Sequence, residues 1–101
     1  MLLALVLGTV VSTRKDRGLL GLKLLRTRER DGTLKPTGNS GGAADAVGAG
    51  ADEVVLLAQG SSARMTEVSR EKPVDAVIVG IVDAVEIGGK DVYLKRAEAA
   101  R

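Results

Sequence analysis

Several stretches of this 101-residue sequence are apolar on both faces of any β-strand that they form. A strand with one wet face alternates apolar and polar residues. In AVIVGIVDAVEI, residues 76–87, both sets of alternate positions are apolar as far as Val82. Residues 2–7 and 54–58 repeat this pattern. A fold for this chain must therefore bury both faces of its central strands.

Short strands separated by glycine-rich turns are typical of small β-barrels. We expect strands at residues 2–12, 19–28, 43–47, 53–59, 76–87 and 91–95, with a turn at Gly88 and Gly89 before the last one. Residues 31–42, DGTLKPTGNSGG, consist of turn-forming types and predict a mobile loop. A short helix is expected at residues 61–69, where Pro73 prevents its extension.

These elements predict one all-β domain over residues 1–101. Its expected fold is a small OB-like antiparallel barrel of five to six strands with one short helix. Gly8 and Gly80 fall inside expected strands, where glycine favours the sharp bends of a small barrel.

The doubly apolar strands also predict self-assembly. A small barrel has one interior, so it hides one face of each strand. The opposite faces, if bare, form a larger apolar patch than monomers usually tolerate. Because the expected helix is too short to cover them, we expect copies of the chain to cover one another in a homo-oligomer.

The composition removes most catalytic chemistries. The chain has neither histidine nor cysteine, so the usual general base at neutral pH and the commonest zinc ligands are absent. The acidic residues lack the spacing of a cation-binding loop; they include Asp45, Asp52, Glu53, Asp75 and Asp83. We expect no catalytic residues, no metal and no other cofactor.

The formal net charge of +2 conceals an asymmetry. Residues 1–50 carry eight Lys/Arg and four Asp/Glu, whereas residues 51–101 carry seven and nine. Most of the positive excess lies in residues 14–30, yet Tyr93 is the only aromatic residue available to stack on a base. An OB-type module that binds nucleic acid or oligosaccharide is therefore only the alternative hypothesis, and no nucleic-acid partner is expected.

The N-terminal stretch MLLALVLGTVV is apolar like part of a signal peptide. No basic residue precedes it, and it is too short to span a bilayer. It predicts a buried first strand in a soluble, cytoplasmic protein with no membrane partner.

The stretch VGAGADEVVLLAQGSSAR, residues 47–64, permits several interpretations. It begins like a dinucleotide-binding loop, but Glu53 stands at the third glycine position and a strand follows instead of a helix. GSSAR lacks the last glycine of the G-x-S-x-G nucleophile motif. We expect the glycines to form tight corners, Ser61 or Ser62 to cap the short helix, and Arg64 to bond carbonyls or an acid within the chain or across an interface.

Three separated stretches carry a family resemblance: VLGTVVSTRKD, ADAVGAGADEVVLLAQGSSAR and KPVDAVIVGIVDAVEI. In this order they resemble the EutN/CcmL family of bacterial microcompartment vertex proteins. The resemblance extends from Met1 to about Gly89 and leaves residues 90–101 as a terminal strand and tail. It implies a small β-barrel that forms cyclic homopentamers at the five-fold corners of a cytoplasmic shell, next to hexameric or pseudo-hexameric shell proteins.

The resemblance makes six residues candidates for subunit contacts or the pore of the ring: Gly48, Gly50, Glu53, Ser61, Ser62 and Arg64. The sequence departs from the family at one corner. Many members have Val-Gly-Glu after Gly-Ala-Gly, whereas this chain has Ala51-Asp52-Glu53. Asp52 must then take the place of a glycine, and aspartate tolerates left-handed conformations better than most residues do.

Overall fold

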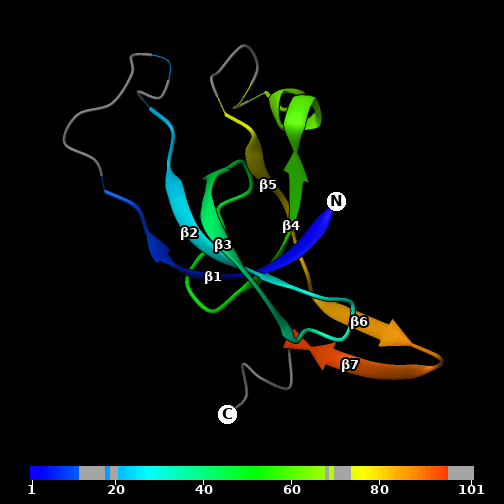
Figure 1. The fold of residues 1–101 in the computed structure, drawn as a ribbon. Coiled ribbons are helices and arrows are strands. Elements are labelled where there is room, and N and C mark those ends of the chain that lie inside the picture. The colour runs from blue at the N-terminus through cyan, green and yellow to red at the C-terminus, as the bar shows by residue number, and fades with distance from the viewer. Residues whose placement is uncertain (12–17, 19–20, 68, 70–73, 96–101) are drawn as a thin grey trace.

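The computed structural model describes residues 1–11, 18, 21–67, 69 and 74–95 (Figure 1). Five strands close into a barrel in the order β1-β2-β3-β5-β4. Their bounds are β1 Leu2–Thr9, β2 Leu24–Arg30, β3 Pro36–Asp45, β4 Val54–Gln59 and β5 Ala76–Ile81. The 3-10 helix η2 (Gly60–Arg64) follows β4, and β6 (Ala84–Ile87) and β7 (Lys90–Leu94) form a separate hairpin.

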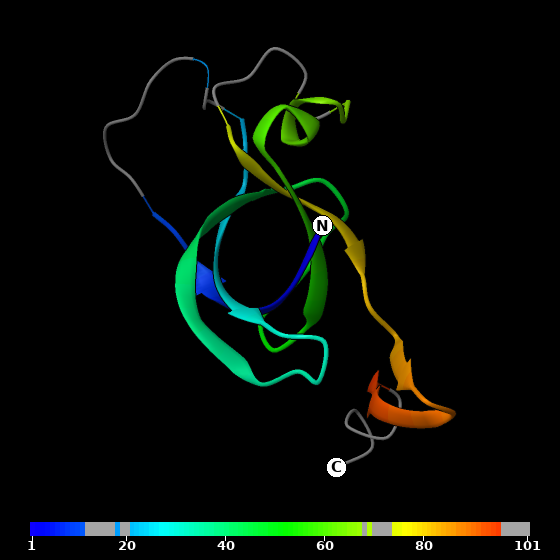
Figure 2. The same cartoon turned by 45° about the vertical axis from the view of Figure 1, so that its right-hand side comes forward.

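The barrel is closed by one short parallel contact. All other neighbouring strands in it pair antiparallel, but β3 and β5 run parallel and pair only through Ala44–Val77 and Asp45–Ile78. Figure 2 shows the barrel as a ring, with the β6–β7 hairpin outside it. The expected small barrel is therefore confirmed, with one parallel pairing that was not expected.

The barrel interior holds a first cluster of buried aliphatic side chains. It consists of small and branched residues: Ala4, Val6, Leu25, Ala43, Ala49, Val55, Leu57 and Ile78. In β2, Leu25 and Thr27 are buried whereas Arg26 and Arg28 are exposed, because successive side chains of a strand point to opposite faces. No aromatic side chain is needed inside so narrow a barrel.

Two further clusters lie on the outer side of the barrel wall. Ala63 of η2 packs with Leu22, Ala44, Val74 and Val77. Tyr93 of the hairpin packs with Val54 and Val82, and Leu3, Leu5 and Leu56 lie against them. The chain thus covers much of its own second face, and the expectation that only other copies could do so was wrong. The larger apolar side chains that stay exposed are Met1, Leu7, Val10, Val11, Val47, Met65, Ile87, Val92 and Leu94.

Residues 36–42, expected to belong to a mobile loop, form most of β3 instead. The strand pairs with β2 from Arg30–Pro36 to Leu24–Ala44. Its seven N-terminal residues are all exposed, so neither burial nor β-propensity marks it in the sequence. Hydrogen bonds to β2 place these turn-forming residues in a strand, which shows how far β-propensity depends on context. The expected strand at residues 43–47 is only its end.

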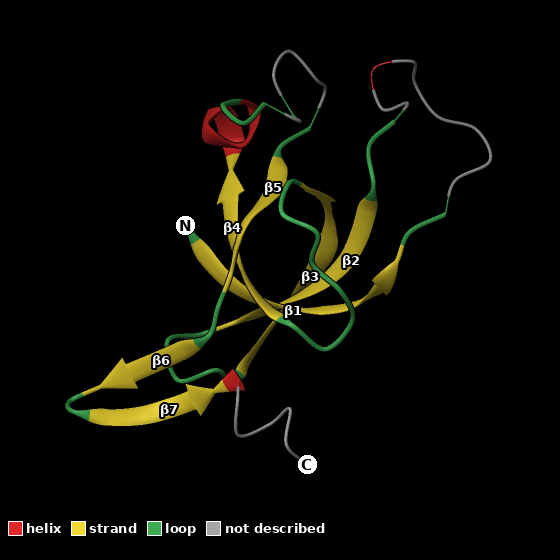
Figure 3. Cartoon of the chain, turned by 180° about the vertical axis from the view of Figure 1, so that it is seen from behind, coloured by secondary structure: helices red, strands yellow, loops and turns green. Residues whose placement is uncertain are grey.

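The expected strand at residues 76–87 is two strands, β5 and β6. Between them Val82 donates its N–H to the carbonyl of Val54 at 2.8 Å, and Asp83 accepts the N–H of Lys95 at 2.9 Å. The chain leaves the barrel at this point and enters the hairpin (Figure 3). The expected turn is confirmed, since Gly88 and Gly89 have φ values of 59° and 82°.

Both in-strand glycines lie where strand pairing is irregular. The register of β1 against β2 shifts between Val6 and Gly8. The register of β4 against β5 shifts next to the Leu56–Gly80 pair. A Cβ atom at Gly80 would come within 3.4 Å of the Leu56 side chain, so glycine permits close packing there.

Other boundaries differ from expectation by a few residues. The strand expected at residues 19–28 is observed at Leu24–Arg30, and the helix expected at residues 61–69 is the shorter η2. Residues 12–17, 19–20, 68, 70–73 and 96–101 lie outside the described part of the chain. They include the expected tail beyond Lys95 and residues 14–17, 19 and 20 of the basic segment at residues 14–30. Within the described residues, no helix has the length and apolarity needed to cross a membrane.

Two glycines of β3 test whether this segment is an ordered strand. Gly41 does not have a positive φ and has open space where a Cβ would stand, whereas Gly38 has a φ of 94°. We expect Gly41→Ala to raise the free energy of unfolding by about 0.5–1 kcal/mol. Gly38→Ala should lower it by about 1 kcal/mol. Urea denaturation measures both, and equal effects of the two substitutions would argue for a disordered segment.

Candidate functional site

The six residues singled out from the sequence do not form one site. They fall into two groups at opposite ends of β4 (Figure 1). Gly48, Gly50 and Glu53 lie in the loop between β3 and β4, here called the corner loop (residues 46–53). The other three, Ser61, Ser62 and Arg64, lie in η2.

Asp45 organises the first half of the corner loop. This residue is 9% exposed at the end of β3. Its Oδ1 atom accepts three consecutive backbone N–H groups at 3.1, 3.1 and 3.2 Å, from Val47, Gly48 and Ala49. Gly48 has a φ of 79°, which glycine adopts without the steric cost that a Cβ brings. This aspartate therefore holds the chain in its turn towards β4.

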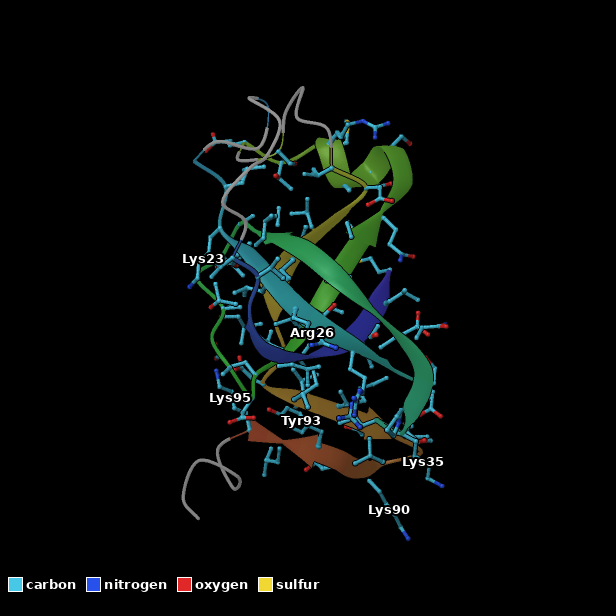
Figure 4. All side chains as sticks on the ribbon, turned by 60° about the vertical axis from the view of Figure 1, so that its left-hand side comes forward. Lys23, Arg26, Lys35, Lys90, Tyr93 and Lys95 are labelled. Atoms are coloured by element: carbon cyan, nitrogen blue, oxygen red, sulfur yellow. The ribbon has the colours of Figure 1, made fainter. Side chains whose placement is uncertain are left out.

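Glu53 organises the second half. Its Oε1 atom accepts the N–H of Gly50 at 2.6 Å, and its Oε2 atom pairs with the Lys95 ammonium group at 2.5 Å. The Lys95 hydrogen bond, followed by the Gly50 N–H, lowers the pKa of Glu53 below the usual value of a glutamate. The same bond raises the pKa of Lys95. Glu53 thus ties the corner loop to the end of the β6–β7 hairpin, where Figure 4 labels Lys95.

Asp52 lies in the turn inside this loop, at the position where the sequence predicted a left-handed conformation. Glu53 donates its N–H to the Gly50 carbonyl at 3.3 Å, and Asp52 has a φ of 67°. This third position of the turn favours glycine, because its φ is positive. Asp52 adopts the left-handed conformation, and its N–H bonds the carbonyl of Val6 in β1 at 2.8 Å. The substitution therefore leaves the corner intact.

The corner loop has the wrong electrostatics for a phosphate. Consecutive backbone N–H groups that point into one concavity can bind an anion. Here the N–H groups of residues 47–50 are all occupied by the carboxylates of Asp45 and Glu53. A phosphate would have to displace two anionic side chains of the protein. GAGADE therefore resembles a nucleotide-binding loop in sequence but not in structure.

The η2 group has a structural role that differs from the expected one. Neither Ser61 nor Ser62 caps the helix, since the N-cap residue is Gln59 and makes no side-chain capping bond. Both serines are exposed within η2 itself. The expected helix cap was therefore wrong, because the helix begins one residue earlier. Arg64 does reach a carbonyl, as expected: its Nη1 atom donates to Val74 at 3.3 Å.

Three residues that the sequence did not indicate hold these two groups in place. Asp45 precedes a glycine-rich turn, and this local pattern could have indicated a side-chain bond to the backbone. Ser69 is fully buried, and its Oγ atom donates to the carbonyl of Ala63 at 2.5 Å. Lys95 lies 42 residues after Glu53, and no local pattern connects the two.

No metal site emerges from the described residues, in which no group of three or more histidine, cysteine, aspartate or glutamate side chains could hold an ion. The carboxylate oxygens of Asp45 and Glu53 bind backbone N–H groups and Lys95 instead. The arrangement stiffens a corner and presents an exposed turn. Its chemistry is that of a structural element.

Comparison with known proteins adds independent information. A family described as "Ethanolamine utilisation protein EutN/carboxysome" matches residues 1–83. The carboxysome shell vertex protein CcmL of Synechocystis sp. is 46% identical over 96 residues, which are 95% of this chain and 96% of that protein. The microcompartment shell vertex protein EutN of Salmonella typhimurium is 45% identical over 95 residues, 94% of this chain and 96% of that protein.

A solved structure is also similar. The structure described as the GrpN pentameric microcompartment shell protein from Rhodospirillum rubrum superposes with a TM-score of 0.77 at 45% identity. The match covers 86% of this chain and 98% of that one. Identity at this level over nearly the whole length indicates common descent as well as a common fold.

Removing the Asp45 side chain should destabilise the fold more than removing most other side chains of this region. Asp45→Ala leaves three N–H groups without an acceptor, and we expect a loss of about 2–3 kcal/mol in the free energy of unfolding. Asp45→Asn keeps a neutral acceptor and should lose about 1 kcal/mol less. Denaturant titrations of both variants measure this, and an equal loss would mean that a neutral acceptor contributes nothing and that the stabilisation depends on the carboxylate charge.

The Glu53–Lys95 pair predicts a defined pH dependence. A lowered glutamate pKa stabilises the fold above about pH 4.3, and this stabilisation disappears as pH falls through the lower folded pKa. A raised lysine pKa stabilises it below about pH 10.4 and the contribution disappears as pH rises further. The stability difference between wild type and Glu53→Gln should be constant near neutral pH and shrink at both extremes. A difference that does not change from pH 3 to pH 7 would contradict this pairing.

Proposed function

The chain belongs to the EutN/CcmL family, and from this premise we propose that it is a structural shell protein whose pentamers close the five-fold vertices of a bacterial microcompartment. The shell lies in the cytoplasm. The observation that carries the proposal is the full-length similarity to shell vertex proteins, one of them described as pentameric. No catalytic step belongs to this role.

Geometry explains why a shell needs such a protein. Hexagonal tiles alone form flat or rolled sheets, so a closed polyhedron requires five-fold units at its corners. A cyclic pentamer is built head to tail, with one surface of each subunit against a different surface of the next. Its outer edge then contacts hexameric or pseudo-hexameric shell proteins.

Exposed apolar side chains are available for contacts between subunits. Apolar side chains that are at least about a third exposed include Leu7, Val10, Val11, Val47 and Leu94. They are fewer than the sequence suggested, because η2 and the hairpin cover much of the outer wall. A homopentamer therefore needs polar and charged contacts in addition to apolar ones.

The alternative, an OB-type module that binds nucleic acid or oligosaccharide, finds less support. Sequence-tolerant binding of single strands uses exposed aromatic faces. Tyr93 is the only aromatic residue of the chain, and it is 7% exposed in the cluster beneath the hairpin. No aromatic face is available to a base or a sugar.

The six candidate residues keep their proposed roles at the interface or pore of this pentamer. For Arg64 the role can be separated from folding, because its side chain is exposed and also bonds Val74 within the chain.

Native mass spectrometry of the purified chain tests the proposal directly, with a pentamer as the expected species. A monomer that persists at micromolar concentration in size exclusion with light scattering would overturn it.

Arg64→Glu should weaken the pentamer, and Arg64→Ala should do so less. The two variants should lose similar unfolding free energy, because both lack the Val74 bond. A pentamer of unchanged stability in both variants would assign Arg64 to intrachain packing alone.

A further inference from the structure

A stripe of three arginines runs along the outer face of β2. The sequence Arg26-Thr27-Arg28-Glu29-Arg30 alternates, and Thr27 is buried while Arg26 and Arg28 are exposed. The three guanidinium groups therefore leave the barrel on the same side. Figure 4 shows Arg26 on this outer wall.

The barrel provides this stripe with no counter-charge. Across β1 the arginines face Gly8, Leu5 and Leu3, and across β3 they face Gly42, Ser40 and Pro36. Within the described part of the chain, the Lys95–Glu53 pair is the one ion pair present, so no arginine of the stripe has an acidic partner there. Like charges along one face repel one another, which makes the stripe a surface suited to an acidic partner.

The hairpin carries the opposite arrangement. Glu86 of β6 and Asp91 of β7 are directly opposite each other, and both are exposed. Like charges directly opposite in an antiparallel pair are destabilising. The acidic pair lies beside exposed apolar residues of the same hairpin, including Ile87, Val92 and Leu94.

Glu86, the β6 member of the acidic pair, points away from the barrel of its own subunit. Val85 and Tyr93 form a cross-strand pair whose side chains pack against the barrel wall. Glu86 follows Val85 directly in β6 and therefore lies on the opposite face of the hairpin. The pairing register shifts between Val85 and Glu86, and Asp91, two residues before Tyr93 in β7, pairs with Glu86 at this irregularity and is exposed there. The hairpin stands outside the barrel ring (Figure 2). Its outer face is thus available to another molecule.

We propose that the outer face of the β6–β7 hairpin of one subunit docks on the arginine stripe of the next subunit in the ring. This inference rests on the proposed pentamer and names the surfaces that build it. The occupant of the stripe is a second copy of this chain, because the chain itself carries the complementary acidic pair on a different surface. Two different surfaces that fit each other satisfy the head-to-tail requirement of a closed ring.

Apolar contacts accompany the charges on both sides. Leu7 of β1, 36% exposed, lies between the β1 residues that pair with Thr27 and Arg26. On the hairpin, Leu94 is 42% exposed and pairs with Ala84. Apolar contacts can therefore supply affinity, while the charges fix register and reject wrong partners.

A charge-swap cycle tests the proposal. Arg28→Glu places an acid against the acidic pair, and Glu86→Arg places a base against the stripe. Each should raise the concentration at which half of the pentamer dissociates by roughly tenfold or more. The double variant, Arg28→Glu with Glu86→Arg, restores opposite charges and should return to within about threefold of wild type. Analytical ultracentrifugation and native mass spectrometry give the readout.

Two controls carry the same charge changes elsewhere. Lys23→Glu lies before β2 and Glu67→Arg lies after η2, both at exposed positions. They should leave the pentamer unchanged, and circular dichroism checks that every variant keeps its β-structure.

The outcomes separate this inference from the proposed function. If the wild type forms no pentamer, the proposed function fails. If the wild type is pentameric and Arg28→Glu assembles equally well, or if the double variant is no better than the single ones, the docking of hairpin on stripe is overturned and the vertex function stands.

Discussion

Strands β1, β4 and β5 are apolar on both sides of the barrel wall, and much of this structure follows from the need to keep water from both sides. The inner side is filled by aliphatic residues small enough for a five-stranded barrel. The outer side is covered by two additions, η2 at one end and the β6–β7 hairpin at the other. These additions explain how a chain with a single aromatic residue buries aliphatic side chains on both sides of its barrel wall.

The same additions place charge where assembly can use it. Because Val85 and Tyr93 hold one face of the hairpin to the barrel, the other face projects outward with Glu86. Because Leu25 and Thr27 point into the barrel, the arginines between and beyond them point out. Burial on one face of each strand thus decides which side chains a neighbouring subunit meets. In the proposed pentamer, intrachain packing and intersubunit contact share the same strands.

The corner loop shows how a glycine-rich turn can be made rigid without a ligand. Two carboxylates of the chain, Asp45 and Glu53, occupy the N–H groups that such loops elsewhere offer to phosphate. Lys95 then neutralises Glu53 and links the loop to the hairpin. A rigid corner loop suits a shell protein, because each subunit must keep one shape in a closed assembly.

Local pattern alone indicated most of the barrel and none of its long-range contacts. Strands β1, β4 and β5 and the turn at Gly88 and Gly89 are recorded in the sequence, since aliphatic runs and paired glycines constrain the backbone where they stand. The lack of histidine and cysteine is likewise a property of composition, and it removes most catalytic and metal chemistry whatever fold the chain adopts.

Only the tertiary structure decided the remaining features. Residues 36–42 form a strand because they pair with β2. Glycine and asparagine have low intrinsic preference for strands, so the sequence of this segment does not predict one. Glu53 and Lys95 meet because the hairpin folds back under the barrel, which no short stretch of sequence records. A sequence states the preferences of each segment, whereas the partner of a strand edge or of a charge is set by the path of the whole chain.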